Sequence, residues 1–307
     1  MVSTVAKFND GLNIVGLCLV RNEDWIIGAS LRAALEWCDQ VMLWTDRCTD
    51  RTKEIAALEV AQEGDNAGRI MFTIGETDTE HWNEMNVRHQ MLTYGRQMGG
   101  THFAIVDADE ILTANHLPSV RNWFRHLSRG QLLEVPMVPV WGSPATYRTD
   151  PCVWTRARLT LGWRDDGAQG WKPRDDGYQH HNRAPYGVAG PICNPAPFDE
   201  SGAHPGGVMH LQWANPRRLL AKHVLYRMVD HLRWPGRRTP ARLNSIYDEA
   251  LSAPGAVSEI PAHWWGSYRK DLIDVTGVPW QEAEIRRLIN ANGLKAFEGL
   301  DLKGFNA

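Results

Sequence analysis

Short apolar runs alternate with amphipathic stretches along the first third of the chain. Residues 12–20 are almost wholly apolar, and after a polar break the apolar positions up to Leu35 recur with the period of a helix. Similar pairs follow, with strands predicted at 40–45, 69–74 and 101–106 and helices at 52–61 and 83–98. Strands that alternate with helices of this length indicate an α/β fold with a mainly parallel sheet. Ligands of such sheets lie beyond the C-terminal ends of the strands.

The pattern changes after Leu112. A strand is predicted at 131–140, and the long stretch at 142–207, rich in Gly, Pro, Asp, Arg and Trp, is expected to be irregular but ordered. A helix is predicted to begin at Asn215-Pro216, because Asn caps helices and Pro suits their first position, and to end before Pro235. Further helices are predicted at 240–252 and 280–292.

Composition and charge narrow the range of functions. The chain of 307 residues has 33 Lys and Arg against 36 Asp and Glu, a net charge of −3, which argues against a protein coated in basic charge for nucleic acid. No apolar run approaches the ~20 residues of a membrane span, and residues 1–13 lack the apolar core of a signal peptide. The five cysteines are scattered without C-x-x-C spacing, which fits a reducing compartment. We therefore expect a cytoplasmic protein without a membrane span.

The sharpest chemical pattern lies at the end of the strand predicted at 101–106. There the sequence continues as Asp107-Ala108-Asp109-Glu110. Residues i and i+2 of an extended chain point to the same side, so Asp107 and Asp109 can converge on one site. Two carboxylates suit a hard divalent cation that also holds phosphate oxygens. Acidic residues of this kind also cap turns and helices, but the position at a strand end favours a metal site.

Three segments resemble glycosyltransferase family 2 and its close relatives, which have the glycosyltransferase A fold. They are the strand and loop at 17–23, the loop at 44–52 and the D-x-D segment at 106–112. The usual family forms are close to R-N-E, D-x-x-S-T-D-G-T and D-x-D-E-F. This chain departs from them at Cys48, where Ser is usual, and at Arg51, where Gly is usual. The resemblance covers about the first 115 residues.

The resemblance implies a Rossmann-like, mainly parallel mixed sheet of the glycosyltransferase A type, flanked by helices. A catalytic domain that binds a nucleotide-sugar would occupy 1–235, with a donor half at 1–115 and an acceptor and metal half at 116–235. Residues 236–307 would form a helical C-terminal extension packed on that domain.

The resemblance also implies the donor site. Asp46 would contact the nucleobase, although an Asp just past a strand can instead cap the next helix. Arg88 would face the pocket, although a helix Arg is somewhat more often solvated. Together with a lysine discussed next, the implied donor-binding residues are Val20, Arg21, Glu23, Asp46, Arg88, Asp107 and Lys222.

A later segment, with His210 in a short predicted strand and Lys222 in the helix that follows, is similar to another motif of these enzymes. A single His is usually a packed or a surface residue, but this context implies that His210 completes a metal site with Asp107 and Asp109. Neutral imidazole beside carboxylates is acceptable to Mn²⁺, and Mg²⁺ is the other candidate. Lys222 would face the donor phosphates, where a cation stabilises the departing nucleotide.

The acceptor side of the site is less determined. An inverting transfer needs a carboxylate base against the acceptor hydroxyl. Six acids lie in the irregular region, and Asp176 is taken as the working candidate; the six are Asp165, Asp166, Asp175, Asp176, Asp199 and Glu200. Residues 217–242 carry eight basic side chains against Asp230, a local excess that could bind a polyanion but that more often forms a solvated face paired with acids.

These expectations combine into one predicted activity. The chain would be a metal-dependent glycosyltransferase that moves a sugar from a nucleoside-diphosphate sugar, UDP-linked, to an acceptor hydroxyl with inversion. The acceptor is open among a glycan, a protein, a small molecule and a modified base of DNA. A nucleotidyltransferase is disfavoured because the Arg21-Asn22-Glu23 loop is not Gly-rich. A non-catalytic protein that binds nucleotides or glycans on the same fold is the alternative of another class.

Overall fold

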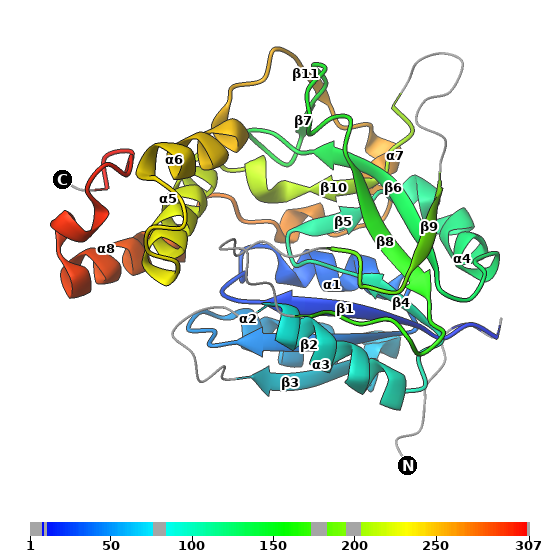
Figure 1. Ribbon diagram of the computed structural model, residues 1–307. Coiled ribbons are helices and arrows are strands. Elements are labelled where there is room, and N and C mark those ends of the chain that lie inside the picture. Colours follow the sequence, from blue (N-terminus) through cyan, green and yellow to red (C-terminus); the bar gives the residue numbers. More distant parts are fainter. Residues whose placement is uncertain (1–7, 9–10, 76–83, 173–182, 195–203, 306–307) are drawn as a thin grey trace.

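The computed structural model describes residues 8, 11–75, 84–172, 183–194 and 204–305. Its centre is a sheet in the order β3-β2-β1-β4-β8-β6-β10-β5, with β9 beside β6 (Figure 1). The strands are β1 Ile14–Val20, β2 Gln40–Asp46, β3 Ile70–Gly75, β4 His102–Ile105, β5 Glu110–Leu112, β6 Gln131–Pro139, β7 Thr146–Arg148, β8 Arg158–Arg164, β9 Ala189–Cys193, β10 Val208–His210 and β11 Val257–Glu259. The predicted α/β class, a mainly parallel mixed sheet flanked by helices, is confirmed.

The first strands form the parallel half of the sheet. β1 pairs in parallel with β2 and β4, and β2 pairs in parallel with β3. Successive side chains of β1 enter different apolar clusters, because a strand alternates its faces. Ile14 and Cys18 pack with helix α1 (Ile27–Leu35), whereas Val15 and Leu17 pack with helix α3 (Glu84–Gln97). The two helices therefore cover opposite faces of the sheet. Because β1, β2 and β4 are parallel, their C-terminal ends lie at one edge (Figure 1).

The other half of the sheet contains the largest departure from the sequence analysis. The stretch at 142–207, expected to be irregular, contains β7, β8 and β9, and β8 lies between β4 and β6, antiparallel to both. β8 escapes prediction because it begins and ends with arginine and has a glycine near its C-terminal end, which breaks the apolar pattern. Gly162 is required there, since a Cβ at this position would lie 2.2 Å from the carbonyl oxygen of Phe103.

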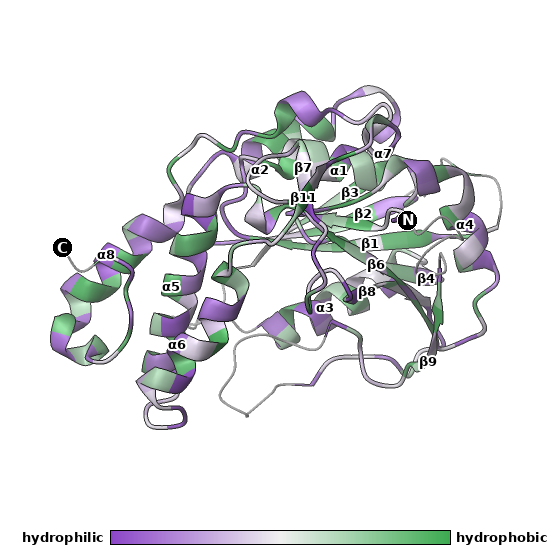
Figure 2. Ribbon diagram, turned by 90° about the horizontal axis from the view of Figure 1, so that it is seen from above, coloured by the Kyte–Doolittle hydropathy of each residue, from purple (hydrophilic) through white to green (hydrophobic). Residues whose placement is uncertain are grey.

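Three further helices gather at one end of the molecule. Helix α5 (Pro216–Arg233) begins as predicted, with the Asn215 side chain accepting hydrogen bonds from two backbone N–H groups of its first turn. α6 (Pro240–Asp248) and α8 (Trp280–Asn292) pack on α5 around a shared apolar cluster. Figures 1 and 2 show these three helices projecting beyond the sheet on the same side. The helix predicted at 280–292 is α8, and that predicted at 240–252 is α6 followed by the 3-10 turn η5 (Glu249–Leu251).

Short elements complete the architecture. They are α2 Thr52–Glu54, η1 Ile55–Val60, η2 Gly64–Asn66, η3 Ala114–His116, α4 Leu117–Arg125, η4 Leu211–Trp213, α7 Ala262–Trp265, η6 Lys270–Leu272 and η7 Leu294–Phe297. β11 pairs with β7 outside the main sheet. Within the described ranges, no helix is long and apolar enough to cross a membrane.

Candidate active site

The D-x-D segment leaves the sheet at the C-terminal edge, between β4 and β5. β5 then pairs antiparallel with β10, and this ladder places Glu110 opposite His210. The backbone N–H of Leu211 donates to the carbonyl oxygen of Asp109 at 2.8 Å, which fixes the neighbouring residue as well. The register of two short strands therefore brings Asp109 and His210 together, although a hundred residues separate them in the sequence.

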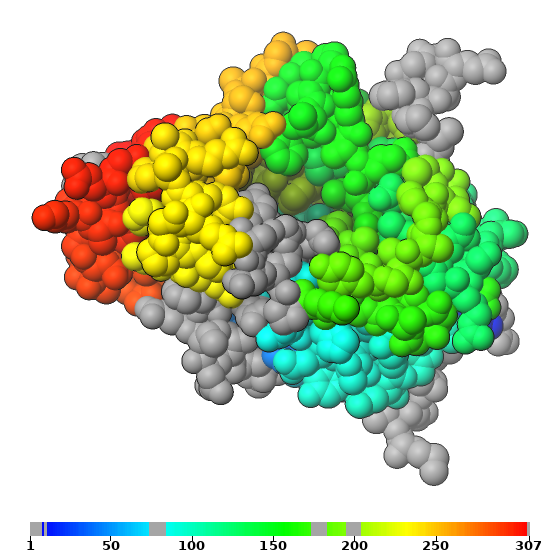
Figure 3. Space-filling view, in the orientation of Figure 1, coloured from blue at the N-terminus to red at the C-terminus, as the bar shows by residue number. Residues whose placement is uncertain are grey.

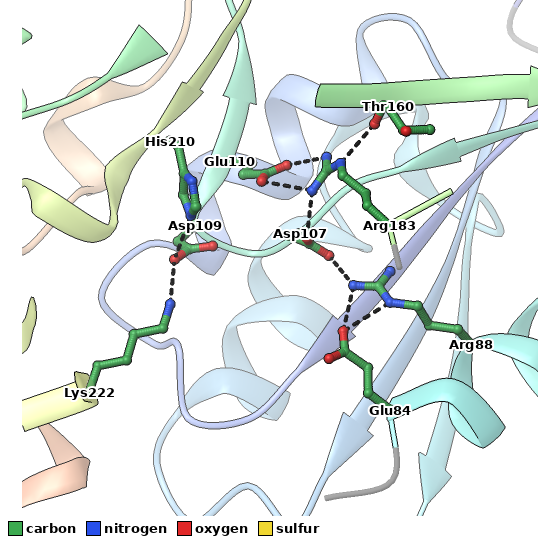
Figure 4. Close-up of polar contacts among 9 residues, drawn as sticks. All are labelled: Glu84, Arg88, Asp107, Asp109, Glu110, Thr160, Arg183, His210 and Lys222. Atoms are coloured by element: carbon green, nitrogen blue, oxygen red, sulfur yellow. Dashed lines mark hydrogen bonds and ion pairs between the residues drawn. The ribbon is translucent and has the colours of Figure 1, made fainter. Parts of the chain in front are cut away.

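Lys222 joins this pair from helix α5. Its Nζ lies 3.1 Å from Oδ2 of Asp109, and Nε2 of His210 lies 3.5 Å from the same oxygen (Figure 4). The ring of Trp213 meets the His210 ring edge to face, with centroids 5.0 Å apart. A carboxylate, an imidazole and an ammonium thus converge at the edge where the sheet is expected to bind its ligand.

Electrostatics keep Asp109 and Lys222 charged. Burial disfavours both charged forms, but the charges of Lys222 and His210 outweigh it and hold the pKa of Asp109 well below its usual range. Burial also disfavours the charged form of Lys222, but the nearby carboxylate of Asp109 outweighs this effect and raises the pKa of Lys222. The pair is a buried ion pair that remains charged at neutral pH.

Asp107 has a different environment from Asp109. Its Oδ1 accepts from Nη2 of Arg88 at 2.7 Å, and its Oδ2 accepts from Nη1 of Arg183 at 2.8 Å (Figure 4). The Arg88 side chain is only 2% exposed and also pairs with Glu84 in α3. The alternative that Arg88 is a solvated helix residue is therefore wrong. Its fixed position beneath Asp107 is that of a residue that orients this carboxylate.

Arg183 lies in the stretch at 142–207 that the sequence analysis expects to be irregular. In the structure its guanidinium also forms a two-pronged ion pair with Glu110, at 2.8 and 2.5 Å, and donates from Nε to the carbonyl oxygen of Thr160 in β8. Burial raises the pKa of Glu110 even though Arg183 opposes that change. No sequence pattern indicates this role, because the contact depends on a distant segment returning to the D-x-D strand.

The arrangement fits a divalent cation that shares its ligands with a bound molecule. Asp109 offers a carboxylate oxygen and His210 an imidazole nitrogen, a donor set that Mn²⁺ accepts. In the described part of the chain, no group of three or more His, Cys, Asp or Glu residues could hold a metal by itself. Two protein ligands leave the other coordination positions to phosphate oxygens and water, as is usual for such ions at phosphate sites.

The loops after β1 and β2 form the neighbouring part of the edge. Asn22 has the left-handed φ of +54° and accepts from the backbone N–H of Thr49 at 2.7 Å, while the N–H of Glu23 donates to Oγ1 of Thr52. The thiol of Cys48 lies 3.7 Å from the carbonyl oxygen of Val20. These bonds hold the two loops against each other, as expected for residues of one pocket.

Asp46 is the last residue of β2, and its side chain is 2% exposed. Its Oδ2 pairs with Nη2 of Arg47 at 3.1 Å. Asp50, not Asp46, accepts from the first backbone N–H of helix α2. The alternative that Asp46 caps this helix is therefore wrong.

Glu23 is a further carboxyl group close to Asp109. Burial, with the charge of Asp109 adding to it, raises its pKa to about 7. The indole N–H of Trp25 donates to Glu23, and Arg218 lies over the Trp25 ring at 4.6 Å. Glu23 therefore belongs to the same cluster of charged groups as Asp109 and Lys222.

Of the six acids considered as the acceptor base, two lie within the described residues and four do not. Asp165 pairs with Arg96, and its backbone N–H donates to the carbonyl oxygen of Thr101, just before β4. Asp166 accepts from the backbone N–H of Ala168. These two acids therefore lie at the opposite edge of the sheet from the D-x-D segment. Asp175, Asp176, Asp199 and Glu200 lie outside the described residues.

Three of the eight basic residues in the run at 217–242 form ion pairs with acidic side chains of the described ranges. Arg217 bonds Glu282, Lys222 bonds Asp109, and Arg227 bonds Asp248. The expectation that acidic neighbours pair with this run is confirmed for these residues. Figure 3 shows α5 and α6, in yellow, beside a hollow that separates them from the green segment after β6.

No protein-family model and no curated protein matches the sequence. Solved structures are similar at a distance. A mannosyltransferase from Pyrobaculum calidifontis, solved with GDP-Man and Mn²⁺, is 14% identical over 92% of this chain and 77% of its own, with a TM-score of 0.37. Glucosyl-3-phosphoglycerate synthase from Mycobacterium tuberculosis, solved with Mn²⁺, UDP and phosphoglyceric acid, is 13% identical over 42% of this chain, with a TM-score of 0.25. The match spans 44% of that synthase.

A structure described as a glucose-1-phosphate thymidylyltransferase from Bacillus anthracis is 8% identical over 76% of this chain and 82% of its own, with a TM-score of 0.28. These neighbours are thus glycosyltransferases and a nucleotidyltransferase. The similarity concerns the general architecture, and the case for function rests on the residues of the site.

Proposed function

We propose that this protein is a metal-dependent glycosyltransferase that moves a sugar from a nucleoside-diphosphate sugar, UDP-linked, to an acceptor hydroxyl with inversion. The observation that carries this proposal is the convergence of Asp109, His210 and Lys222 at the C-terminal edge of the sheet. A carboxylate and an imidazole suit Mn²⁺ or Mg²⁺, and the adjacent ammonium suits a diphosphate.

In this proposal Asp109 and His210 hold the cation, with Asp107 beside them. The cation, when bound, acts as a Lewis acid that stabilises the negative charge of the departing nucleoside diphosphate. Lys222 adds a second positive charge close to the same phosphates. Because these charges are fixed in a buried place, little reorganisation is needed as the bond to the sugar breaks.

The other donor-site residues orient the nucleotide. Val20, Arg21 and Glu23 line its pocket, and the buried carboxylate of Asp46 accepts an N–H of the base. Arg88 holds Asp107 in place, so that Asp107 can meet the ribose. The acceptor hydroxyl would lose its proton to a carboxylate of the region around Asp176, which keeps the role of working candidate.

A non-catalytic binding protein would have little use for a buried, charged Asp109–Lys222 pair, since a buried ion pair is weak as a source of stability. The pairing of Arg217 and Arg227 with acidic side chains reduces the basic excess that would support a nucleic-acid acceptor. We therefore favour a glycan, a protein or a small molecule as the acceptor class.

Calorimetric titration with UDP and GDP, with and without Mn²⁺, tests the proposal on the wild type and on Asp109→Asn. We expect one nucleotide to bind only with Mn²⁺, and to bind at least about 10-fold more weakly to the variant, because charge-assisted contacts are lost. Asp271→Asn is the matched control, since Asp271 is an exposed carboxylate paired with Arg269. Failure of both nucleotides to bind the wild type would refute the proposal.

A further inference from the structure

The C-terminal extension reaches the donor site at one point. Arg21 directly follows β1, and its Cζ lies 4.8 Å from the centroid of the Trp280 ring. Trp280 is the first residue of α8, within the expected C-terminal extension at 236–307. A guanidinium over an indole face is a favourable cation–π contact, which also keeps the planar group in one orientation.

Arg21 lacks the partners that a buried arginine usually has. Its Nε is buried and has no hydrogen-bond partner among the described residues. Burial lowers the pKa of Arg21, and the positive charge of Arg47 lowers it further. The carboxylates of Glu284 and Asp46 only partly offset these two effects. A buried, unpaired N–H beside a second cation is unfavourable unless a ligand supplies an acceptor. The position therefore calls for an electron-rich oxygen from a bound molecule.

The first turn of α8 is fixed with respect to the site. The Arg217 guanidinium bonds Glu282 of this turn, and α5 and α8 share an apolar cluster. The same helix α5 carries Lys222 into the metal and phosphate site. A hydrogen bond from Arg287 lowers the pKa of Glu284, and the charges of Arg21 and Arg47 add to this effect. Glu284 thus balances the two cations from the outer side.

We propose that α8 forms a wall of the donor pocket, and that Trp280 is a positioning residue that holds Arg21 against the nucleoside diphosphate. This inference rests on the proposed function, because it requires a nucleotide in this pocket. Trp280 supports one face of the guanidinium, and the free Nε–H of Arg21 donates to an oxygen of the nucleotide. The donor site then combines Arg21, which follows β1, with Trp280 of the C-terminal helix α8.

The test measures UDP and GDP affinity in the presence of Mn²⁺ for Trp280→Leu and Trp280→Phe. Leucine keeps the apolar packing of α8 but offers no aromatic face, so we expect binding roughly 3- to 30-fold weaker, the range of a cation–π contact. Phenylalanine keeps a face and should restore most of the affinity. The matched control is Trp234→Leu, because Arg233 lies 4.5 Å from the Trp234 ring at the other end of α5.

A cycle with Arg21→Ala separates positioning from a general structural role. If Trp280 acts through Arg21, then Trp280→Leu weakens binding in the wild type but has little further effect when Arg21 is already absent. Equal losses in both backgrounds, or unchanged affinity in Trp280→Leu, would overturn the inference. If Arg21→Ala loses affinity while Trp280→Leu does not, the proposed function stands without it. If the wild type binds neither nucleotide, the proposed function itself fails.

Discussion

A single oxygen of Asp109 is shared by two positively polarised groups, at 3.1 Å for Lys222 and 3.5 Å for His210. In a cation-bound state the metal and the ammonium must both be accommodated near this carboxylate. Lys222 therefore has opposite effects on the two ligands. Its charge repels a bare divalent cation, and it attracts a diphosphate.

The substitution Lys222→Met tests this opposition. Without the ammonium we expect Mn²⁺ alone to bind at least about 3-fold more tightly, because a repulsive charge within a few ångströms is removed. UDP in the presence of Mn²⁺ should bind more weakly, since the same charge attracts its phosphates. Both affinities are measured by calorimetry. Lys303→Met, which removes an ammonium paired with Asp248 and Asp301, should change neither.

Arg183 contacts two carboxylates, one on each side of Asp109 in the sequence. It bonds Asp107 and forms a two-pronged pair with Glu110, whose side chain is only 4% exposed. Arg183→Met leaves Glu110 buried without its partner, so we expect a loss of about 3 kcal/mol in the free energy of unfolding by urea denaturation. Adding Glu110→Gln to this variant should recover part of the loss, because the unpaired charge is removed.

The matched control for Arg183 is an exposed pair of the same type. Arg269 and Asp271 are 51% and 63% exposed, so Arg269→Met should cost far less stability than Arg183→Met, because solvent screens an exposed pair. Similar losses in Arg183→Met and Arg269→Met would show that the buried network contributes nothing special to the fold.

At the scale of elements, helix α5 links the site to the C-terminal helices. Asn215 caps it by accepting from the N–H groups of Arg217 and Arg218, and it also donates to the carbonyl oxygen of Val275. Asn215→Ala removes the cap and this tie, and we expect a loss of about 1 to 2 kcal/mol in the free energy of unfolding. Thr239→Ala at the exposed cap of α6 should cost less, which the same urea titration would show. An equal loss would contradict the role given to Asn215.

The elements that could be predicted from the sequence are those whose signal is local. β1, β2 and β4 have apolar runs followed by polar breaks, and α5 and α8 have a cap, a proline or a helical period. β8 could not be predicted, because its place between β4 and β6 is set by contacts such as the close approach of Gly162 to Phe103. The residues of the candidate site divide in the same way, into those that have a local sequence signal and those that have none.

Asp107 and Asp109 follow β4, so their position at this edge could be predicted. The expectation that they converge as i and i+2 of an extended chain is wrong, because the chain turns at residues 108–109. Asp107 contacts two arginines, whereas Asp109 contacts Lys222.

The pairing of His210 with Asp109 needs the β5–β10 register, which the sequence indicates only through the family resemblance. Arg183 and Trp280 reach the site from segments whose own patterns carry no such indication. Long-range contacts of this kind are decided by packing across the whole chain.

At the scale of the molecule, a joint between η3, the segment before β10 and α7 contains two histidines, of which His116 is buried and His204 is half-buried. His116 in η3 and His204 lie close enough to interact, and the His204 ring packs between Tyr147 and Trp264 of α7. Burial lowers the pKa of both histidines from 6.5 to about 4. Between pH 6.5 and 4 these histidines therefore bind protons in the unfolded chain but not in the folded protein, and the free energy of unfolding falls as the pH falls.

Glu23 acts in the opposite direction over part of this range. Its folded pKa of about 7 lies above the usual 4.5, so the folded protein takes up a proton first and gains stability as the pH falls from 7 towards 4.5. The acid sensitivity of the histidines is therefore best isolated by difference. The comparison of wild type with a histidine variant cancels the contribution of Glu23.

We expect His116→Gln to flatten the decline in urea midpoint between pH 7 and pH 4.5, because glutamine takes up no proton in the unfolded chain. His204→Gln should act in the same direction, and His126→Gln, at an exposed position at the end of α4, should leave the pH profile unchanged. The effect concerns the stability of the whole molecule, because the two histidines lie where η3, the segment before β10 and α7 meet. A wild-type profile parallel to that of His116→Gln would mean that this joint opens before global unfolding and binds its protons in the native state.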